Sequence, residues 1–175
     1  MRNIVLKFGF ISGGISAALM TLTFVLLRGP WLFESGAFVG YAGMVLSFSV
    51  IYVGVRSYRE QAGSGYVSFG KALQVGMLIA LVSSLCYALT WLVINNLFWP
   101  DFADDYSRHA MDRLRQSGAT EAVLQEKMKM MEEYKRLTAN PFLSALITLT
   151  EPLPVGILVS LISAALLRKK PAEVA

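Results

Sequence analysis

The sequence contains few residues that bind metals or carry out nucleophilic catalysis, and it shows no nucleotide-binding motif. Cys86 is the only cysteine and His109 the only histidine among 175 residues. An intrachain disulfide is therefore impossible, and a metal site built from several histidine and cysteine ligands is not expected. We predict a protein that is not an enzyme and that has no catalytic residue, cofactor or metal. His109 itself is expected to be exposed and solvated on a polar helix face.

Charged residues are scarce over four long stretches of the chain. Residues 8–27, 36–55 and 72–97 carry none, and residues 142–167 carry only Glu151. A helix needs about 20 apolar residues to cross about 30 Å of hydrocarbon, so each stretch is long enough to span a bilayer. We predict an all-α membrane protein with four transmembrane helices, a single membrane domain over residues 1–175, and the lipid bilayer as its surroundings.

Basic residues are distributed unevenly along the chain. Eight of them lie before the first span, between the second and third, or after the fourth: Arg2, Lys7, Arg56, Arg59, Lys71, Arg168, Lys169 and Lys170. Residues 101–139 instead hold seven basic and eight acidic residues. Cytoplasmic loops are enriched in Lys and Arg, so we expect a multi-pass protein with both termini in the cytoplasm. This asymmetry accounts for the net charge of +4, and nucleic-acid binding is not expected.

Residues 101–139 have the pattern of two amphipathic helices. Apolar residues recur every four positions from Phe102 to Leu114, Gly118 ends this pattern, and Thr120 is a plausible N-cap of a second helix. We predict an extracytoplasmic helical hairpin on or above the outer leaflet, with its apolar sides packed together or facing headgroups. Alternatively, its methionine-rich side could dock a protein of the cell envelope, because methionine side chains adapt to differently shaped partners.

Small residues recur about once per turn on each predicted span, as close packing between membrane helices requires. The four stripes are Gly9, Gly13 and Ala17; Gly36, Gly40, Gly43 and Ser47; Gly76, Ala80, Ser84 and Ala88; and Gly156, Ser160 and Ala164. They predict a compact bundle. They also allow a homo-oligomer through small-residue faces, because Gly36 and Gly40 have the spacing of a helix dimerisation motif.

Glu151 is the one charged residue inside a predicted span. Counted from Pro141 at about 1.5 Å per residue, it lies about 15 Å into the membrane, where carboxyl groups are rare and usually functional. Pro152 and Pro154 cannot donate to the carbonyls of the preceding turn, so the helix should be kinked or broken beside Glu151.

Two roles follow for this intramembrane site, whose candidate residues are Glu151, Pro152, Pro154, Thr148, Asn95 and Trp91. Freed carbonyls beside a carboxyl can bind a cation or a polar substrate, as in transporters. Alternatively, the carboxyl is structural and forms hydrogen bonds within the bundle. Its partners would then be Ser144 and Thr148 on its own helix, or Asn95, Asn96, Tyr87 and Trp91 on the third span.

Several short motifs, spread over nearly the whole chain, occur together in a known protein family. They are Lys7-Phe8-Gly9, Ser68-Phe69-Gly70-Lys71-Ala72, Tyr87 with Trp91, Asn140-Pro141, and Glu151-Pro152-x-Pro154-x-Gly156. Together they resemble the bacterial membrane family called domain of unknown function 4199. The resemblance implies a small integral protein of the bacterial inner membrane with about four spans, and it implies no activity.

Two functions are compatible with these expectations. The first is a structural, scaffold or regulatory membrane protein that acts through the outer helical hairpin, residues 101–139. The second is a small oligomeric transporter or ion-conducting protein in which Glu151 is the coupling or coordinating carboxylate.

Overall fold

The structure is a computed structural model that describes residues 1–27, 29 and 31–169. Lys170, one of the predicted cytoplasmic basic residues, lies outside the described residues. The described part forms seven α-helices and two π-helical segments. In chain order they are α1 (Arg2–Thr21), η1 (Leu22–Leu26), α2 (Leu32–Gln61), α3 (Phe69–Val93), η2 (Ile94–Phe98), α4 (Phe102–Gln116), α5 (Glu121–Thr138), α6 (Pro141–Leu149) and α7 (Pro152–Leu167).

Four helical stretches are long and apolar enough to cross a membrane: Arg2–Leu26, Leu32–Gln61, Phe69–Phe98 and Pro141–Leu167. The prediction of an all-α membrane protein with four spans is therefore confirmed. Most stretches extend beyond the uncharged segments of the sequence. A helix satisfies its own backbone hydrogen bonds in water as well as in lipid, so it need not end where the hydrocarbon ends.

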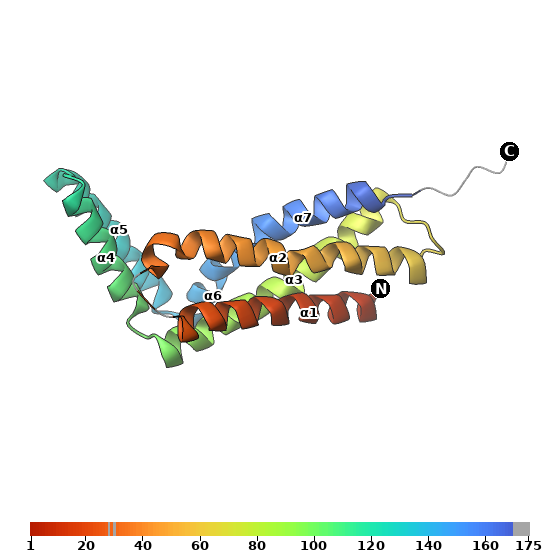
Figure 1. The fold of residues 1–175 in the computed structure, drawn as a ribbon, viewed down its shortest axis with the longest axis horizontal. Coiled ribbons are helices and arrows are strands. Elements are labelled where there is room, and N and C mark those ends of the chain that lie inside the picture. Colours follow the sequence, from red (N-terminus) through yellow and green to blue (C-terminus); the bar gives the residue numbers. More distant parts are fainter. Residues whose placement is uncertain (28, 30, 170–175) are drawn as a thin grey trace.

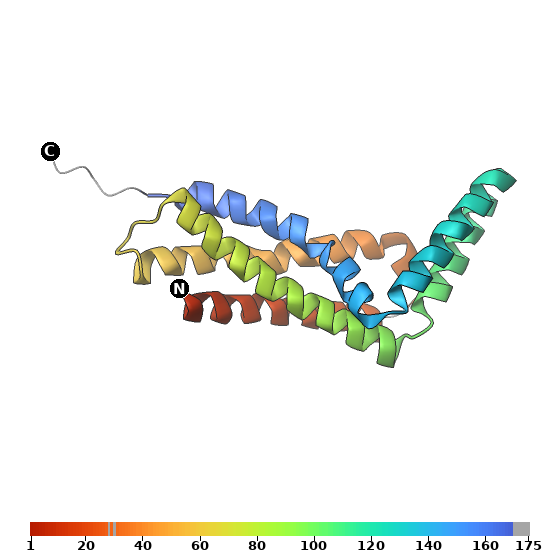
Figure 2. The same ribbon diagram turned by 180° about the vertical axis from the view of Figure 1, so that it is seen from behind.

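The bundle has two different ends, which Figures 1 and 2 show from opposite sides. The N-terminus, the connection between α2 and α3, and the end of α7 lie together at one end, which we call the basic end. Its described basic residues are Arg2, Lys7, Arg56, Arg59, Lys71, Arg168 and Lys169. The helices α4 and α5 lie at the opposite end, the far end, and extend away from the bundle.

Backbone hydrogen bonds close the basic end. Val67, just before α3, and Lys169, just after α7, donate to each other's carbonyls at N–O distances of 3.1 and 2.9 Å. The Arg59 guanidinium donates to the Leu167 carbonyl at 3.4 Å. Carbonyls at a helix C-terminus have no partner within the helix, so a nearby cation stabilises them. These contacts tie the α2–α3 connection to the end of α7.

The glycine stripes lie mostly at helix interfaces, as predicted. A Cβ atom built on Gly9 would lie 2.7 Å from the Cβ of Val82 on α3, and one on Gly156 would lie 2.8 Å from the Cβ of Ala80. Such distances show that the backbones approach as closely as side chains permit. The stripe on α2 is mixed: a Cβ on Gly43 would lie 3.5 Å from Leu19 of α1, whereas one on Gly40 meets nothing within 4 Å and one on Gly36 meets only Leu32 of the same helix.

Buried hydroxyl groups connect the first three spans. The Ser12 hydroxyl of α1 donates to the Ser47 carbonyl of α2 at 2.8 Å. It also lies 2.9 Å from the Ser83 hydroxyl of α3, within hydrogen-bonding distance. Polar contacts of this kind hold membrane helices together, because lipid provides no hydrophobic driving force between them.

An aromatic cluster at the far end attaches α4 to the bundle. Phe102, the first residue of α4, packs edge-on against Trp91 of α3 and Trp99, with ring centroids 5.0 and 5.2 Å apart. Phe24 of η1 and Phe33 of α2 complete the cluster, at 5.3 Å from Trp91 and 5.8 Å from Trp99. Rings from three spans therefore fix the starting point of α4.

The helices α4 and α5 lie side by side and are joined at the tip by a tight turn (Figure 2). Gly118 in this turn has φ of +75°, a conformation that glycine adopts without steric cost. Asp104 of α4 and Lys135 of α5 form an ion pair at 2.6 Å across the two helices. We refer to these two helices as the α4–α5 pair.

Candidate functional site

The expected helix break beside Glu151 is present. The helix α6 ends at Leu149, and α7 begins at Pro152, so Glu151 occupies the N-cap position of α7. Asn140 begins α6, and its side-chain oxygen accepts hydrogen bonds from the backbone of Phe142 and Leu143. Figure 2 shows α6 turned away from the axis of α7. Proline removes a backbone donor from the first turn of α7, which accounts for the break.

The Glu151 carboxyl has one hydrogen-bond partner among the candidates. The Tyr87 hydroxyl of α3 donates to its Oε2 at 3.0 Å. Thr148 instead donates to the Ser144 carbonyl at 2.8 Å. The side chain of Trp91 belongs to the aromatic cluster, and Asn95 lies about two turns beyond Tyr87 on η2. The structure thus brings Tyr87 to Glu151, whereas the other candidates have different partners or lie elsewhere.

Glu151 lies close to the far surface of the hydrocarbon layer when its depth is counted from the basic end. Arg168 follows it by 17 residues, or about 25 Å at about 1.5 Å per residue. Tyr87 follows Lys71 by 16 residues and gives about 24 Å. These are lengths along the helices, and in a layer about 30 Å thick they place the carboxyl in the half nearer the far surface. The sequence estimate of about 15 Å assumed one straight helix from Pro141, whereas α6 and α7 are separate helices.

Tyr134 of α5 lies near the same carboxyl. Partial burial raises the pKa of its hydroxyl, and the charges of Glu151 and then of Tyr106 raise it further. The Glu151 side chain is nevertheless exposed at the side of the bundle. The carboxyl therefore contacts Tyr87 of α3 at a place open to the surroundings of the protein.

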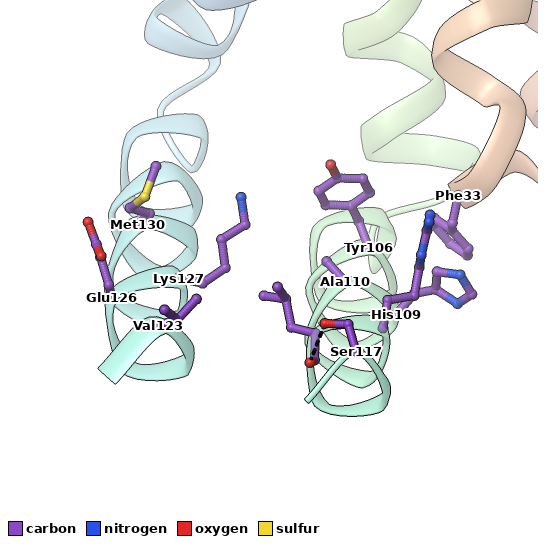
Figure 3. Close-up of a pocket in the computed structure, with 11 residues that line it drawn as sticks. Phe33, Tyr106, His109, Ala110, Ser117, Val123, Glu126, Lys127 and Met130 are labelled. Carbon is purple, nitrogen blue, oxygen red and sulfur yellow. Dashed lines mark hydrogen bonds between the residues drawn. The ribbon is translucent and has the colours of Figure 1, made fainter. Parts of the chain in front are cut away.

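A second candidate site is a groove of about 560 Å³ on the α4–α5 pair. Figure 3 shows its residues, which come from both helices and from Phe33 at the start of α2. Most of the lining is apolar: Tyr106, Ala110 and Leu114 on α4, and Val123 and Met130 on α5. The two helices touch along one side and leave this groove open along the other.

Three charged side chains line the groove. Arg113 comes from α4, and Lys127 and Glu126 come from α5. In Figure 3 the Lys127 side chain points into the space between the two helices. Within the part of the chain that the structure describes, neither Arg113 nor Lys127 forms an ion pair. The groove thus combines an apolar lining with two cations and one anion.

The prediction that His109 is exposed on a polar face is wrong. Its ring stacks on Phe33 with centroids 5.1 Å apart, and its Nε2 is buried without a hydrogen-bond partner among the described residues. His109 follows Phe102 by seven residues, so it lies on the same face of α4. This spacing was available in the sequence, whereas the contact with Phe33 depends on how α4 sits on the bundle.

The spacing of apolar residues along each helix predicts only part of the groove lining. Its apolar residues on α4 were identified by their spacing, but Arg113 and Lys127 have the appearance of ordinary solvated charges in the sequence. Arg113 and Lys127 line the same groove only because α4 and α5 pack side by side, which the sequence does not show. No group of three or more His, Cys, Asp or Glu residues that could hold a metal ion occurs in residues 1–27, 29 and 31–169.

The arrangement of four membrane-length helices with an appended amphipathic helix pair defines a small multi-pass membrane protein. The chain belongs to the family described as "Protein of unknown function (DUF4199)", which matches residues 7–169. The resemblance seen in the sequence motifs is therefore confirmed. No curated protein and no solved structure matches the chain.

Proposed function

We propose that this protein is a structural or regulatory protein of the bacterial inner membrane, without enzymatic activity, that acts through the α4–α5 pair. The observation that carries the proposal is the groove of about 560 Å³ on this pair. The four spans anchor the chain, and the aromatic cluster holds α4 at a fixed place on their far end. The α4–α5 pair is the part of the molecule that is available to bind another molecule outside the bundle.

The distribution of charge supports an orientation with the α4–α5 pair outside the cytoplasm. The seven described basic residues of the basic end lie near the N-terminus, the α2–α3 connection and the end of α7, whereas residues 101–139 carry nearly balanced charge. The positive-inside rule then assigns the basic end to the cytoplasm. In this orientation the α4–α5 pair is an extracytoplasmic helical hairpin.

The exposed apolar side chains of the pair support a role in binding. Tyr106, Val123 and Met130 line the groove and are 46%, 44% and 56% exposed. Contiguous apolar surface of this kind on a protein in water marks a site that another molecule covers. If α4 and α5 packed tightly against each other along their whole length, these residues would be buried between them. They instead line an open groove.

Photo-crosslinking in native membranes tests this proposal. A photoreactive amino acid in place of Met130 lies in the groove, and one in place of Lys129 serves as the matched control on the polar face of the same helix. We expect a defined adduct, to lipid or protein, at Met130 and not at Lys129. Equal and nonspecific labelling at both positions would contradict a binding role for the groove.

A second function, a small oligomeric transporter or ion-conducting protein, is favoured by the hydrogen bond between Tyr87 and Glu151 at a helix break. The space at Gly40 on α2, where an added Cβ would meet nothing within 4 Å, supports oligomer formation. Purified protein in liposomes under a pH gradient tests this alternative. Proton-coupled flux that is present in the wild type and lost in Glu151→Gln would support transport. Absence of flux in the wild type would favour the binding role of the α4–α5 pair.

A further inference from the structure

The groove on the α4–α5 pair reaches the bundle at its base. Phe33 belongs to α2, yet it lines the groove together with residues of α4 and α5. Figures 1 and 2 show the pair leaving the far end at a steep angle and extending to one side, beyond the other helices. Since the spans cross the bilayer, the space beneath this overhang is the membrane surface. Lipid headgroups are therefore the molecules nearest to the base of the groove.

The lining of the groove suits a molecule that is part anion and part hydrocarbon. Arg113 on α4 and Lys127 on α5 supply cations from two different helices. Guanidinium groups bind phosphate through paired hydrogen bonds, and a lysine can place its ammonium at the headgroup level while its stem lies along apolar surface. Tyr106, Val123 and Met130 provide that apolar surface.

We propose that the groove holds the headgroup of an anionic phospholipid from the adjacent leaflet, with its phosphate bound by Arg113 and Lys127. The upper part of the lipid then packs on Tyr106, Val123 and Met130. This inference rests on the proposed function, because it names the molecule that the α4–α5 pair binds. It also explains why two cations that form no ion pair with the described residues lie in one groove with exposed apolar side chains, where Glu126 is the one acidic residue.

The size of the groove favours a lipid over a helix of a partner protein. A volume of about 560 Å³ falls within the range of about 300 to 1,000 Å³ that is common for small-molecule sites. A bound helix is about 10 Å in diameter and needs anchor positions over several turns. The lipid is also always present, because the spans place the groove at the membrane surface.

Native mass spectrometry of the full chain in mild detergent tests the proposal, with phosphatidylglycerol as the added lipid. The test variant is Arg113→Gln/Lys127→Gln. The matched control is Arg115→Gln/Lys129→Gln, which removes two exposed charges of the same types from the same helices outside the groove. We expect the test variant to bind the most tightly held lipid at least tenfold more weakly, and the control to bind it as the wild type does.

Two further measurements test whether the bound phosphate belongs to a lipid or is free phosphate, and whether the test variant is still folded. Inorganic phosphate at millimolar concentration should not displace the lipid, because it lacks the apolar part. The charge-conserving variant Arg113→Lys/Lys127→Arg should retain binding, which shows that charge and not loss of fold explains the test variant. Equal lipid binding by the wild type and the test variant would overturn the proposal.

The outcome also separates this inference from the proposed function. Specific crosslinks from Met130 to a protein, together with unchanged lipid binding in the test variant, would reject the lipid and keep the binding role of the α4–α5 pair. Crosslinks to phospholipid that disappear in Arg113→Gln/Lys127→Gln would support both.

Discussion

Gly156 and Gly14 both lie in apolar spans, but the space available for a side chain differs between them. A Cβ on Gly156 would lie 2.8 Å from Ala80 Cβ, an atom fixed to the backbone of α3, whereas a Cβ on Gly14 meets nothing within 4 Å. We expect Gly156→Ala to lower the free energy of unfolding by about 1 to 3 kcal/mol through overpacking. Gly14→Ala should be neutral or raise it by up to about 1 kcal/mol, because alanine favours the helix.

Thermal and denaturant unfolding in detergent would measure both variants. Equal stability of Gly156→Ala and Gly14→Ala would show that α3 and α7 do not pack as closely as the structure describes.

The hydrogen bond between Tyr87 and Glu151 gives a second prediction at the residue scale. Tyr87→Phe removes the only hydroxyl that donates to this carboxyl among the described residues, and should cost about 0.5 to 1.5 kcal/mol of stability. Glu151→Gln keeps an oxygen acceptor at the same place, so it should cost less. Glu151→Leu removes the acceptor altogether. The double variant Tyr87→Phe/Glu151→Leu should therefore lose less stability than the sum of the two single changes, because both remove the same bond.

A double-mutant cycle of thermal stability in detergent measures this coupling. Full additivity of Tyr87→Phe and Glu151→Leu would mean that the two side chains act independently, and that Glu151 faces its surroundings without a structural partner.

At the scale of elements, Phe33 links α2 to the α4–α5 pair. Its ring contacts Trp99 within the aromatic cluster and stacks on His109 of α4. We expect Phe33→Ala to speed amide hydrogen exchange in α4 and α5 about tenfold or more, because the pair loses its main contact with α2. Phe38→Ala is the control, because Phe38 belongs to the same helix and is 78% exposed.

Exchange mass spectrometry in detergent or nanodiscs resolves the two helices by peptide. Equal exchange rates in the wild type and in Phe33→Ala would show that Phe33 does not stabilise the pair, and that the contacts of Phe102 with Trp91 and Trp99 and the connection to α6 are sufficient.

The break between α6 and α7 explains why a carboxyl is tolerated within a span. Glu151 lies at the N-terminal end of α7, about 25 Å along the helix from Arg168, and therefore in the half of the hydrocarbon nearer the far surface; the break frees this end of α7 from a continuous helix. At this depth the carboxyl can reach the headgroup region, and the energetic penalty of burial in lipid is smaller than at the bilayer centre.

At the scale of the whole molecule, the sequence predicts the spans well and the sites poorly. Uncharged runs and small-residue stripes locate α1, α2, α3 and α7, because composition and spacing alone decide whether a helix fits in lipid. The depth of Glu151 and the environment of His109 depend on bends and on contacts between distant segments. Such features follow from packing, which a single sequence does not display.

The orientation of the molecule gives the last prediction. We expect Ser64, in the α2–α3 connection, to face the cytoplasm and Ser117, at the tip of the α4–α5 pair, to lie outside. In a Cys86→Ala background, a membrane-impermeant thiol reagent should label Ser117→Cys on intact cells. It should label Ser64→Cys only after the membrane is breached. Both serines are exposed, so a difference in labelling reports membrane side and not burial.

The reverse pattern would place seven basic residues of the basic end outside and the nearly neutral α4–α5 pair in the cytoplasm. The groove would then face the cytoplasmic leaflet, and Arg113 and Lys127 would still meet phosphate there. Lipid binding by the groove depends on the overhang and not on the side of the membrane. A reversed orientation would therefore reject the extracytoplasmic assignment while leaving the proposed lipid site open to its own test.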